Sequence, residues 1–596
     1  MFNNMIFFRQ NVQTQDGQAR PRRKVGCLGG CLIFFAVYFI CSAILGWIMG
    51  DALSSSSVTL QDKTVYRLQM KGVLVEQGQE DNPFAGLMGQ MPYVGNRAKQ
   101  ETVGLDNILS NIRLAKNDDK ILGIWLDGAE LNMAPASAKA IRDALLDFQK
   151  SGKWILASAK SYGQTNYYVA SVADCIVLDP TGEVGWNGLA AEKMYFTRVL
   201  EKIGVEMQIL KVGTFKSAVE PFFRTSMSDA DRMQTMQYIG GIWDEYKSAV
   251  AASRHMDVAQ LDALADRFMG VQSAKANLEA GLVDTIVYCQ DVDSLLRVFA
   301  GTKDYHMLTT PKLAQVERPK SKAKEKVAVL YLEGEITDDS GDGIVGKKVI
   351  KTIKKIGKDE DIKALVLRVN SPGGSADASE QIWHAIQNIK AKNIPVVVSM
   401  GDYAASGGYY ISCGADYIYA EPTTLTGSIG IFGTIPSVAK LRNKIGLDID
   451  GVSTNKHSAM EGNMLYNGLN DSERALMQEM IERGYDLFTS RCAEGRHVEQ
   501  SYIKSIGEGR VWLGAKGKEI GIVDELGNID DAINKAVELA GLDSYQLTYY
   551  PAKKDPYEEL LKLLDNTTEE ERLIMKVREF ASKPRIMALM PEVEIQ

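Results

Sequence analysis

Histidine and cysteine are scarce in this sequence, and neither is arranged for the chemistry it usually performs. Only five histidines and seven cysteines occur among 596 residues. The histidines are scattered, with no metal-ligand spacing and no recognisable Ser/His setting. Three cysteines share one apolar run and the other four are widely spaced, which argues against a disulfide framework or a zinc site and favours core thiols. We therefore expect no metal and no cofactor.

An excess of positive charge is also lacking. The formal net charge is −8, with 45% hydrophobic and 24% charged residues. Nucleic-acid-binding proteins are usually basic, so we expect no nucleic-acid partner. The composition is typical of a globular protein, and the length is too great for a single core, which predicts two to four domains.

Near the N-terminus, the run at 25–50 contains no charged residue. About 20 apolar residues span a bilayer, so this run is long enough to cross one. It follows a cluster of positive residues, Arg20, Arg22, Arg23 and Lys24. Because positive residues tend to stay in the cytoplasm, we expect a cytoplasmic tail at 1–24 and a protein body on the opposite side. A cleaved signal peptide is the alternative, but its apolar region would be only about 7–15 residues, so we favour an uncleaved transmembrane anchor.

The remainder of the chain contains an internal repeat. ILGIWLDGAELNMAPASAKAI (121–141) aligns with IKALVLRVNSPGGSADASEQI (362–382), and the similarity continues at a nearly constant offset through SRHMD (253–257) and GRHVE (495–499). Apolar, β-branched runs alternate with helical patterns in each copy, which predicts an α/β fold with parallel sheets covered on both faces.

The repeat sets the expected domain boundaries. We place the first repeat at 58–310 and the second at 327–545, with a charged linker at 311–326. Residues 77–100, within the first repeat, are expected to form a surface loop. The segment 546–596 is expected to be a helical tail with a packing or assembly role.

The two copies differ at positions that could form a catalytic site. The second copy has NSPGG where the first has AELNM, so Gly373 and Gly374 correspond to Asn132 and Met133. A strand that ends in Pro-Gly-Gly can turn sharply and present backbone N–H groups, the donors that an oxyanion hole needs. A plain turn is the alternative for this motif alone.

Two serines are replaced together with these glycines. Ser406, in DYAASGGYYIS, corresponds to Thr165 in the first copy, and Ser428 corresponds to Trp186. Turn chemistry would be needed equally in both copies, so the joint loss favours one working site in the second copy. Ser406 could otherwise be a helix cap, but this comparison favours a nucleophile.

A nucleophilic serine requires a base, and no histidine is well placed in the sequence. The first copy carries Lys216 within GTFKSAVEPF, among small residues. A lysine can act as a base if burial lowers its pKa towards neutrality. An ordinary surface lysine is the alternative for this decapeptide alone.

Taken together, GTFKSAVEPF, NSPGGSADASE, DYAASGGYYIS and TLTGSIGIFG resemble the signal peptide peptidase A (protease IV) family in its long, duplicated bacterial form. The resemblance covers most of the chain and implies two tandem Clp protease/crotonase-like repeats. It implies a serine endopeptidase with a Ser/Lys dyad, in which Ser406 is the nucleophile and Lys216 the general base. By the same resemblance Ser428 orients the lysine, and Gly373 or Gly374 supplies the oxyanion hole.

The resemblance also implies a cellular setting. Members of this family degrade signal-peptide remnants and other apolar peptides at the membrane, and they form homotetramers. We therefore expect a single-pass protein of the bacterial inner membrane with a periplasmic catalytic body. Lys456, which aligns with Lys216, is expected to be vestigial, because the first copy has nothing for it to activate.

Two other functions remain possible at this point. The first is a crotonase-like acyl-CoA enzyme, because a fold by itself does not determine function. The second is a membrane scaffold or quality-control protein whose protease site has decayed.

Overall fold

The computed structural model describes residues 58–78, 101–318, 321–552, 585–590 and 594–595. Val58–Gln596 forms one compact unit. The expected cytoplasmic tail and membrane anchor lie outside the described residues, as do nearly all of the expected loop at 77–100 and the segment 557–583. None of the helices in the described part of the chain is both long and apolar enough to cross a bilayer.

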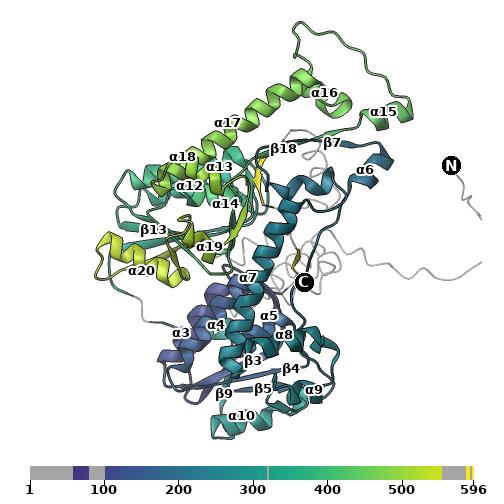
Figure 1. Cartoon of the computed structure of the whole chain (residues 1–596). Helices are drawn as coiled ribbons and strands as arrows, with labels where there is room; N and C mark the ends of the chain where they lie inside the picture. Colours follow the sequence, from purple (N-terminus) through teal and green to yellow (C-terminus); the bar gives the residue numbers. More distant parts are fainter. Residues whose placement is uncertain (1–57, 79–100, 319–320, 553–584, 591–593, 596) are drawn as a thin grey trace, which may run out of the picture. The chain divides into compact units, whose positions relative to one another are not determined.

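The first repeat is built on a parallel sheet, as its apolar, β-branched segments predict (Figure 1). The strand order is β2-β1-β3-β4-β5-β8, with β9 also paired to β1. The strands are β1 (Thr64–Val75), β2 (Thr102–Gly104), β3 (Ile121–Asn132), β4 (Trp154–Ala159), β5 (Cys175–Leu178), β8 (Thr285–Ile286) and β9 (His306–Thr309). The helices are α3 (Leu105–Asn117), α4 (Pro135–Gln149), α5 (Gln164–Ala170), α6 (Thr197–Ile203), α7 (Asp229–Arg254), α8 (Val258–Asp266), α9 (Ala274–Glu279) and α10 (Val292–Ala300), with short 3₁₀ turns at η1 (Ser217–Phe222), η2 (Met269–Val271) and η3 (Cys289–Asp291).

The second repeat has an equivalent sheet in the order β19-β17-β15-β13-β10-β21, with β16 paired to β15 and β20. Its strands run parallel except for the β17–β19 pair. The strands are β10 (Lys326–Glu333), β13 (Ile362–Ser371), β15 (Val396–Ala405), β16 (Tyr417–Ala420), β17 (Leu425–Gly427), β19 (Val511–Leu513), β20 (Glu525–Leu526) and β21 (Gln546–Tyr550). The helices are α12 (Gly346–Ile356), α13 (Ala376–Lys390), α14 (Gly407–Ser412), α15 (Ala439–Ile445), α16 (Met460–Asn467), α17 (Asp471–Arg496), α18 (Gln500–Ile506), α19 (Gly514–Glu519) and α20 (Ile529–Ala540).

Helices cover both faces of each sheet, which explains why the strands are apolar throughout. In the second repeat, Leu330 and Leu367 pack on one face against α12, α13 and α17, whereas Val329 and Val366 pack on the other face against α20 (Figure 1). In the first repeat the corresponding layers are α3, α4 and α7 on one face and α10 on the other. The predicted α/β class with parallel sheets is therefore confirmed.

The duplication is visible in details of the helices. The longest described helix of each repeat, α7 and α17, has 26 residues. Each ends at a histidine in the left-handed conformation, His255 with φ 54° and His497 with φ 55°. The preceding short helices α6 and α15 both end at a left-handed glycine, Gly204 and Gly446.

A third sheet joins the two repeats. Its order is β12-β11-β14-β22-β18-β7, and β7 comes from the first repeat. The strands are β7 (Glu206–Lys211), β11 (Ile336–Thr337), β12 (Ile344–Val345), β14 (Gly373–Ser375), β18 (Phe432–Ser437) and β22 (Arg585–Leu589). A separate two-stranded pair consists of β6 (Ala191–Glu192) and β23 (Glu594–Ile595).

The C-terminal segment and the linker differ from the sequence-based expectation. The described parts of 546–596 are strands, not helices, and β21 completes the second sheet by pairing with β10, beyond the boundary expected at residue 545. The period-2 pattern of QLTYY suits this edge position. The linker begins with the short helix α11 (Thr310–Ala314), because Leu313 is buried in the core of the first repeat.

Candidate active site

Ser406 lies at the junction of β15 and α14, where the chain turns sharply. Its backbone has φ 55° and ψ −115°, a conformation that costs a non-glycine residue about 1–3 kcal/mol. Its N–H donates to the carbonyl of Gly427 at 2.8 Å, which holds the turn in place. Ser406 occupies the N-cap position of α14, yet its side chain makes no capping hydrogen bond. The hydroxyl is therefore free for another partner.

That partner is Lys216. The lysine Nζ lies 2.7 Å from Ser406 Oγ, although 190 residues separate them in the chain. The same nitrogen lies 3.0 Å from both the carbonyl oxygen and the Oγ of Ser428. All three side chains are fully buried. The structure thus brings together the three residues that the sequence singled out from two different repeats.

Burial determines the charge state of Lys216. Loss of hydration holds the pKa of its amine well below the ordinary value of 10.5. Its three close oxygen partners are hydroxyl and carbonyl groups, none of which carries a negative charge to restore the ammonium form. The side chain therefore has the electrostatic setting of a neutral amine, which can accept a proton.

Strand pairing carries Lys216 across to the second repeat. β7 runs antiparallel to β18, from Lys211 opposite Phe432 to Glu206 opposite Ser437. Lys216 follows β7 and directly precedes the 3₁₀ turn η1. At Gly509 an added Cβ would lie 2.6 Å from the Cβ of Lys216, so only glycine permits this approach.

Gln234 of α7 fixes the backbone around Lys216. Its Nε2 donates to the carbonyl of Phe215 at 3.1 Å and to Ser217 Oγ at 2.8 Å. Its Oε1 accepts from the N–H of Val511 in the second repeat at 3.2 Å. A lone glutamine on a helix carries no recognisable pattern, so the sequence does not mark this residue as functional.

The Pro-Gly-Gly turn adopts backbone conformations that other residues avoid. Gly373 has φ 106° and Gly374 has φ 152°. An added Cβ at Gly374 would lie 2.0 Å from the carbonyl oxygen of Ile336, so a side chain cannot be accommodated. The N–H of Gly373 donates to Ser371 Oγ at 3.2 Å, and Gly374 lies on the strand edge paired with β22. Of the two glycines, Gly374 therefore has its N–H directed towards the position of the paired strand β22.

A buried polar network joins the repeats beside this site. Arg368 of β13 donates to the Glu76 carboxylate at 2.8 and 3.2 Å, and Asp402 of β15 accepts from the N–H and Oγ of Ser137 at 2.8 and 2.6 Å. Burial raises the pKa of Asp402. β13 leads into the glycine turn and β15 leads to Ser406, so the network holds both strands against the first repeat. In the sequence, this network is indicated by charged residues that interrupt apolar strands, Arg368 in β13 and Asp402 in β15.

The equivalent location in the first repeat is filled. Trp186, which stands in place of Ser428, is fully buried against Tyr167 and Trp243, and its Nε1 donates to the carbonyl of Leu261. The hydroxyl of Thr165 accepts a hydrogen bond from Tyr246. Lys456 lies on an exposed segment, whereas Lys216 is fully buried. The first repeat thus holds aromatic packing where the second holds Ser406, Lys216 and Ser428.

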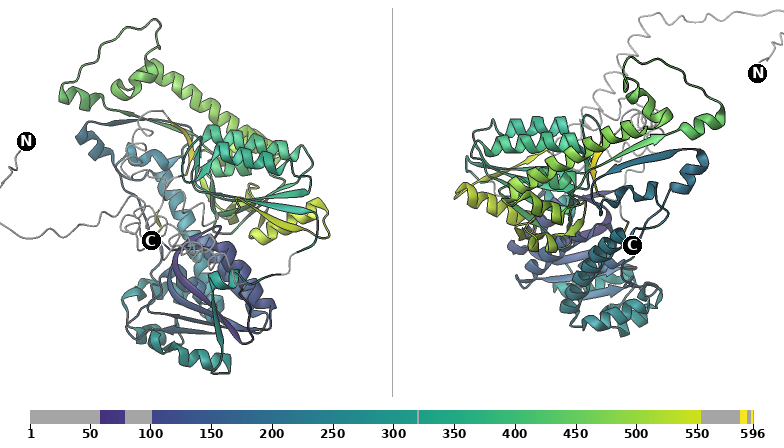
Figure 2. Two further views of the ribbon diagram at one scale, coloured as in Figure 1. Left: turned by 180° about the vertical axis from the view of Figure 1, so that it is seen from behind. Right: turned by 45° about the horizontal axis from the view of Figure 1, so that its top comes forward.

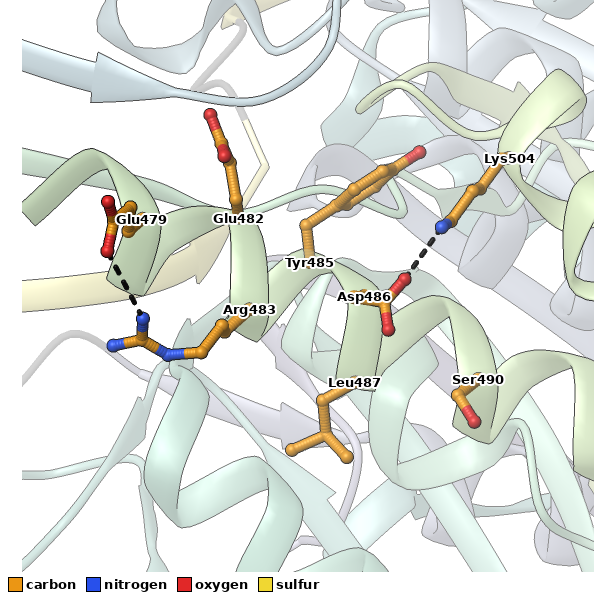
Figure 3. Close-up of a pocket in the computed structure, with 8 residues that line it drawn as sticks. All are labelled: Glu479, Glu482, Arg483, Tyr485, Asp486, Leu487, Ser490 and Lys504. Carbon is orange, nitrogen blue, oxygen red and sulfur yellow. Dashed lines mark hydrogen bonds and ion pairs between the residues drawn. The ribbon is translucent and has the colours of Figure 1, made fainter. Parts of the chain in front are cut away.

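The surface also carries a pocket of about 740 Å³ along α17, which none of these residues lines (Figure 3). Its polar groups pair with one another, Lys504 with Asp486 and Arg483 with Glu479. This is a solvated helix surface. Within the described part of the chain, no three His, Cys, Asp or Glu side chains converge to hold a metal ion.

Comparison with known proteins gives a consistent picture. Residues 147–302 and 388–543 each match the profile of peptidase family S49, and residues 321–424 match that of the Clp protease family. Protease 4 of Salmonella typhi is 36% identical over 531 residues, covering 87% of this chain and 85% of that protein. Protease 4 of Haemophilus influenzae is 33% identical, covering 85% and 84%. The chloroplastic serine protease SPPA of Arabidopsis thaliana is 27% identical, covering 74% and 66%.

Proposed function

From the premise that this chain belongs to peptidase family S49, and is therefore a serine protease, we propose that it is an endopeptidase with Ser406 as nucleophile and Lys216 as general base. The observation that carries the proposal is the buried 2.7 Å approach of Lys216 Nζ to Ser406 Oγ. A lysine with a lowered pKa is suited to this role because its lone pair can accept the hydroxyl proton.

The reaction follows from the hydrogen bonds around the amine. A neutral amine has two N–H groups and one lone pair. If the N–H groups donate to the carbonyl and Oγ of Ser428, the lone pair faces the Ser406 hydroxyl. Ser406 Oγ attacks the peptide carbonyl as its proton moves to Lys216. The resulting ammonium then protonates the leaving amine, and a water activated by the same lysine hydrolyses the acyl-enzyme.

The oxyanion formed in this step requires backbone donors. We assign this role to the N–H of Gly374, because the N–H of Gly373 points back to Ser371 Oγ within the turn, whereas Gly374 lies on the edge that pairs with β22. Removal of one such donor in other enzymes costs about 10²–10³ in kcat.

We further propose that the protein is anchored in a bacterial inner membrane, with its catalytic body in the periplasm, and that it degrades signal-peptide remnants and other apolar peptides. The uncharged run at 25–50, with the positive cluster before it, supports the anchor and its orientation. The resemblance described above supports the substrate class.

A homotetramer is part of the same proposal, and the duplicated arms support it. The arm of the first repeat, α6 with β7, is paired within the chain to β18. The arm of the second repeat, residues 446–459 between α15 and α16, runs outward and has no strand partner among the residues that the structure describes (Figure 2). Several of its apolar residues are exposed: Ile445, Leu447, Ile449 and Val452. This surface suits a contact with the first repeat of another subunit.

Labelling with a fluorophosphonate tests the enzyme assignment directly. We expect covalent modification at Ser406, found by peptide mass spectrometry and abolished in Ser406→Ala, together with cleavage of an apolar fluorogenic peptide. Absence of both labelling and cleavage would favour a decayed scaffold. Turnover of an acyl-CoA thioester without peptide cleavage would favour a crotonase-like enzyme.

A further inference from the structure

The α18–β19 turn, residues 507–510, lies between the chain segments that carry Lys216 and Ser428. The carbonyl of Glu508 accepts a hydrogen bond at 2.9 Å from the backbone N–H of the residue that precedes Lys216. The carbonyl of Arg510 accepts one at 2.7 Å from the N–H of Ser428. The turn is thus bonded to both segments, and it sets the spacing between the proposed base and the serine that contacts it.

This turn packs backbone against backbone with its neighbours. An added Cβ at Gly509 would lie 2.6 Å from the Cβ of Lys216, and one at Gly430 would lie 2.9 Å from the Cα of Gly509. On the other side, an added Cβ at Gly213 would lie 2.4 Å from the carbonyl oxygen of Glu508. Close packing of this kind transmits displacements, so a shift of the turn would also move Lys216.

The side chain of Arg510 ties the turn to the first repeat. Its guanidinium carbon lies 4.1 Å from the ring centroid of Trp512 and 4.7 Å from that of Phe215, the residue before Lys216. Its Nη2 donates to Gln237 Oε1 on α7 at 2.6 Å. Aromatic faces attract cations, and a planar guanidinium can also stack on them while it stays charged. Arg510 therefore holds both the turn and the segment that leads into Lys216.

The first repeat has an equivalent turn with different residues. Alignment of AKANLE with AKGKEI places Phe268 opposite Gly509 and Met269 opposite Arg510. The backbone is conserved, since Phe268 has φ 53° and Gly509 has φ 79°. Met269 is fully buried, whereas Arg510 reaches across to the other repeat. The turn can therefore form without this glycine and this arginine, and both residues accompany the lysine that approaches the turn.

We propose that Arg510 is a positioning residue for Lys216, acting through the α18–β19 turn and through Phe215. The proposal rests on the function proposed above. Its effect is to keep the amine 2.7 Å from Ser406 Oγ and out of water. Because Arg510 acts on the base and not on the substrate, its loss lowers kcat and leaves KM unchanged. Loss of hydration holds the pKa of Lys216 down, so a loosened turn that admits water raises this pKa.

Arg510→Met tests the proposal, because methionine is the residue that the first repeat carries at this position. Misplacement of a reacting group by about 1 Å can cost about 10²-fold in rate. In cleavage of an apolar fluorogenic peptide by the full chain, we expect kcat to fall about tenfold or more and KM to change less than about twofold. The rising limb of kcat/KM should move to higher pH. An unchanged kcat and pH limb would overturn the proposal, as would a raised KM at unchanged kcat.

Arg491→Met is the matched control for loss of an arginine from a tryptophan ring. The guanidinium carbon of Arg491 lies 4.2 Å from the ring centroid of Trp383, and its ion-pair partners lie on α13 and α17. We expect this variant to keep the kcat and the pH profile of the wild type. A loss of kcat equal to that of Arg510→Met would overturn the proposal.

A second pair of variants covers the case in which Arg510→Met fails to fold. Gly509 and Gly521 have similar left-handed backbones, with φ 79° and 72°, so alanine strains both alike. Within the described part of the chain, an added Cβ at Gly521 would meet no atom within 4 Å beyond its chain neighbours, whereas one at Gly509 would meet Lys216. Gly509→Ala should therefore lower kcat about tenfold or more, and Gly521→Ala should not. Equal kcat values for the two would overturn the role of the turn.

Hydrogen exchange in the Ser406→Ala background separates positioning from catalysis. The N–H groups of Phe215 and Ser428 donate to the turn, and peptides that contain them can be followed by mass spectrometry. We expect several-fold faster exchange in Arg510→Met than in Arg491→Met. Equal exchange, in an enzyme whose Ser406 form cleaves peptides, refutes the positioning role alone. Faster exchange in Arg510→Met, with no peptide cleavage by any form, refutes the proposed function alone.

Discussion

Replacement of Lys216 by methionine removes the proposed base while retaining most of its volume. Methionine is unbranched, like the lysine stem, and fits the fully buried site without leaving a large cavity. Ser406 Oγ then loses its partner at 2.7 Å, and within the described part of the chain no other base lies within hydrogen-bonding distance of this hydroxyl. Removal of a general base costs about 10²–10⁴-fold in rate, equivalent to about 2.7–5.4 kcal/mol at 1.36 kcal/mol per tenfold.

The same substitution makes an opposite prediction for stability. In the unfolded chain the amine is protonated up to its ordinary pKa of 10.5, whereas burial lowers the pKa in the folded protein. The unfolded state therefore binds more protons, and this group makes the wild type less stable as pH falls below 10.5. Lys216→Met should therefore melt at or above the wild-type temperature at pH 7, with the difference shrinking towards pH 10.5.

The assay is cleavage of an apolar fluorogenic peptide by detergent-solubilised protein between pH 6 and 10. In the wild type, kcat/KM should rise with pH as Lys216 loses its proton and should level off well below pH 10.5. Lys456→Met is the matched control and should cleave like the wild type, because Lys456 is exposed. The general-base role of Lys216 is refuted if Lys216→Met keeps more than about a tenth of wild-type kcat, or if Lys456→Met lowers kcat as strongly as Lys216→Met.

Three further substitutions test the surroundings of this pair. Ser428→Ala removes one hydrogen bond to Lys216 Nζ and should lower kcat about five- to tenfold, measured by the same assay, while the rising pH limb is retained because burial is unchanged. Gln234→Leu removes the hydrogen bonds to Phe215, Ser217 and Val511 and should lower kcat more than it raises KM. An unchanged kcat would show that the backbone around Lys216 keeps its position without Gln234. Arg368→Met leaves Glu76 buried without a counter-charge and should lower the free energy of unfolding by about 3–5 kcal/mol in urea titration, and combining it with Glu76→Gln should restore much of the loss.

Much of the site could be predicted from the sequence because the two repeats of the chain can be compared with each other. The two repeats differ at Ser406, Ser428 and the glycine turn, and these differences marked the second copy without any contact being known. Local chemistry explains this success. Sharp turns demand glycine, and apolar, β-branched runs demand a buried parallel sheet, whatever the rest of the molecule does.

The tertiary structure decided what no local pattern encodes. Only the antiparallel pairing of β7 with β18 brings Lys216 to Ser406, and only burial among uncharged partners lowers the pKa of its amine. Gln234 acts on residues far away in the chain, so its sequence surroundings carry no signal. The charge of Arg368 inside an apolar strand marks a buried polar contact, but nothing local identifies Glu76 as the partner. The C-terminal strand is the clearest case, since a strand is defined by the edges it pairs with, and the residues of β14 and β18 that pair with β22 lie more than 150 positions away in the chain. The sequence thus determined which residues are suited to peptide cleavage, whereas long-range strand pairing determined that they meet.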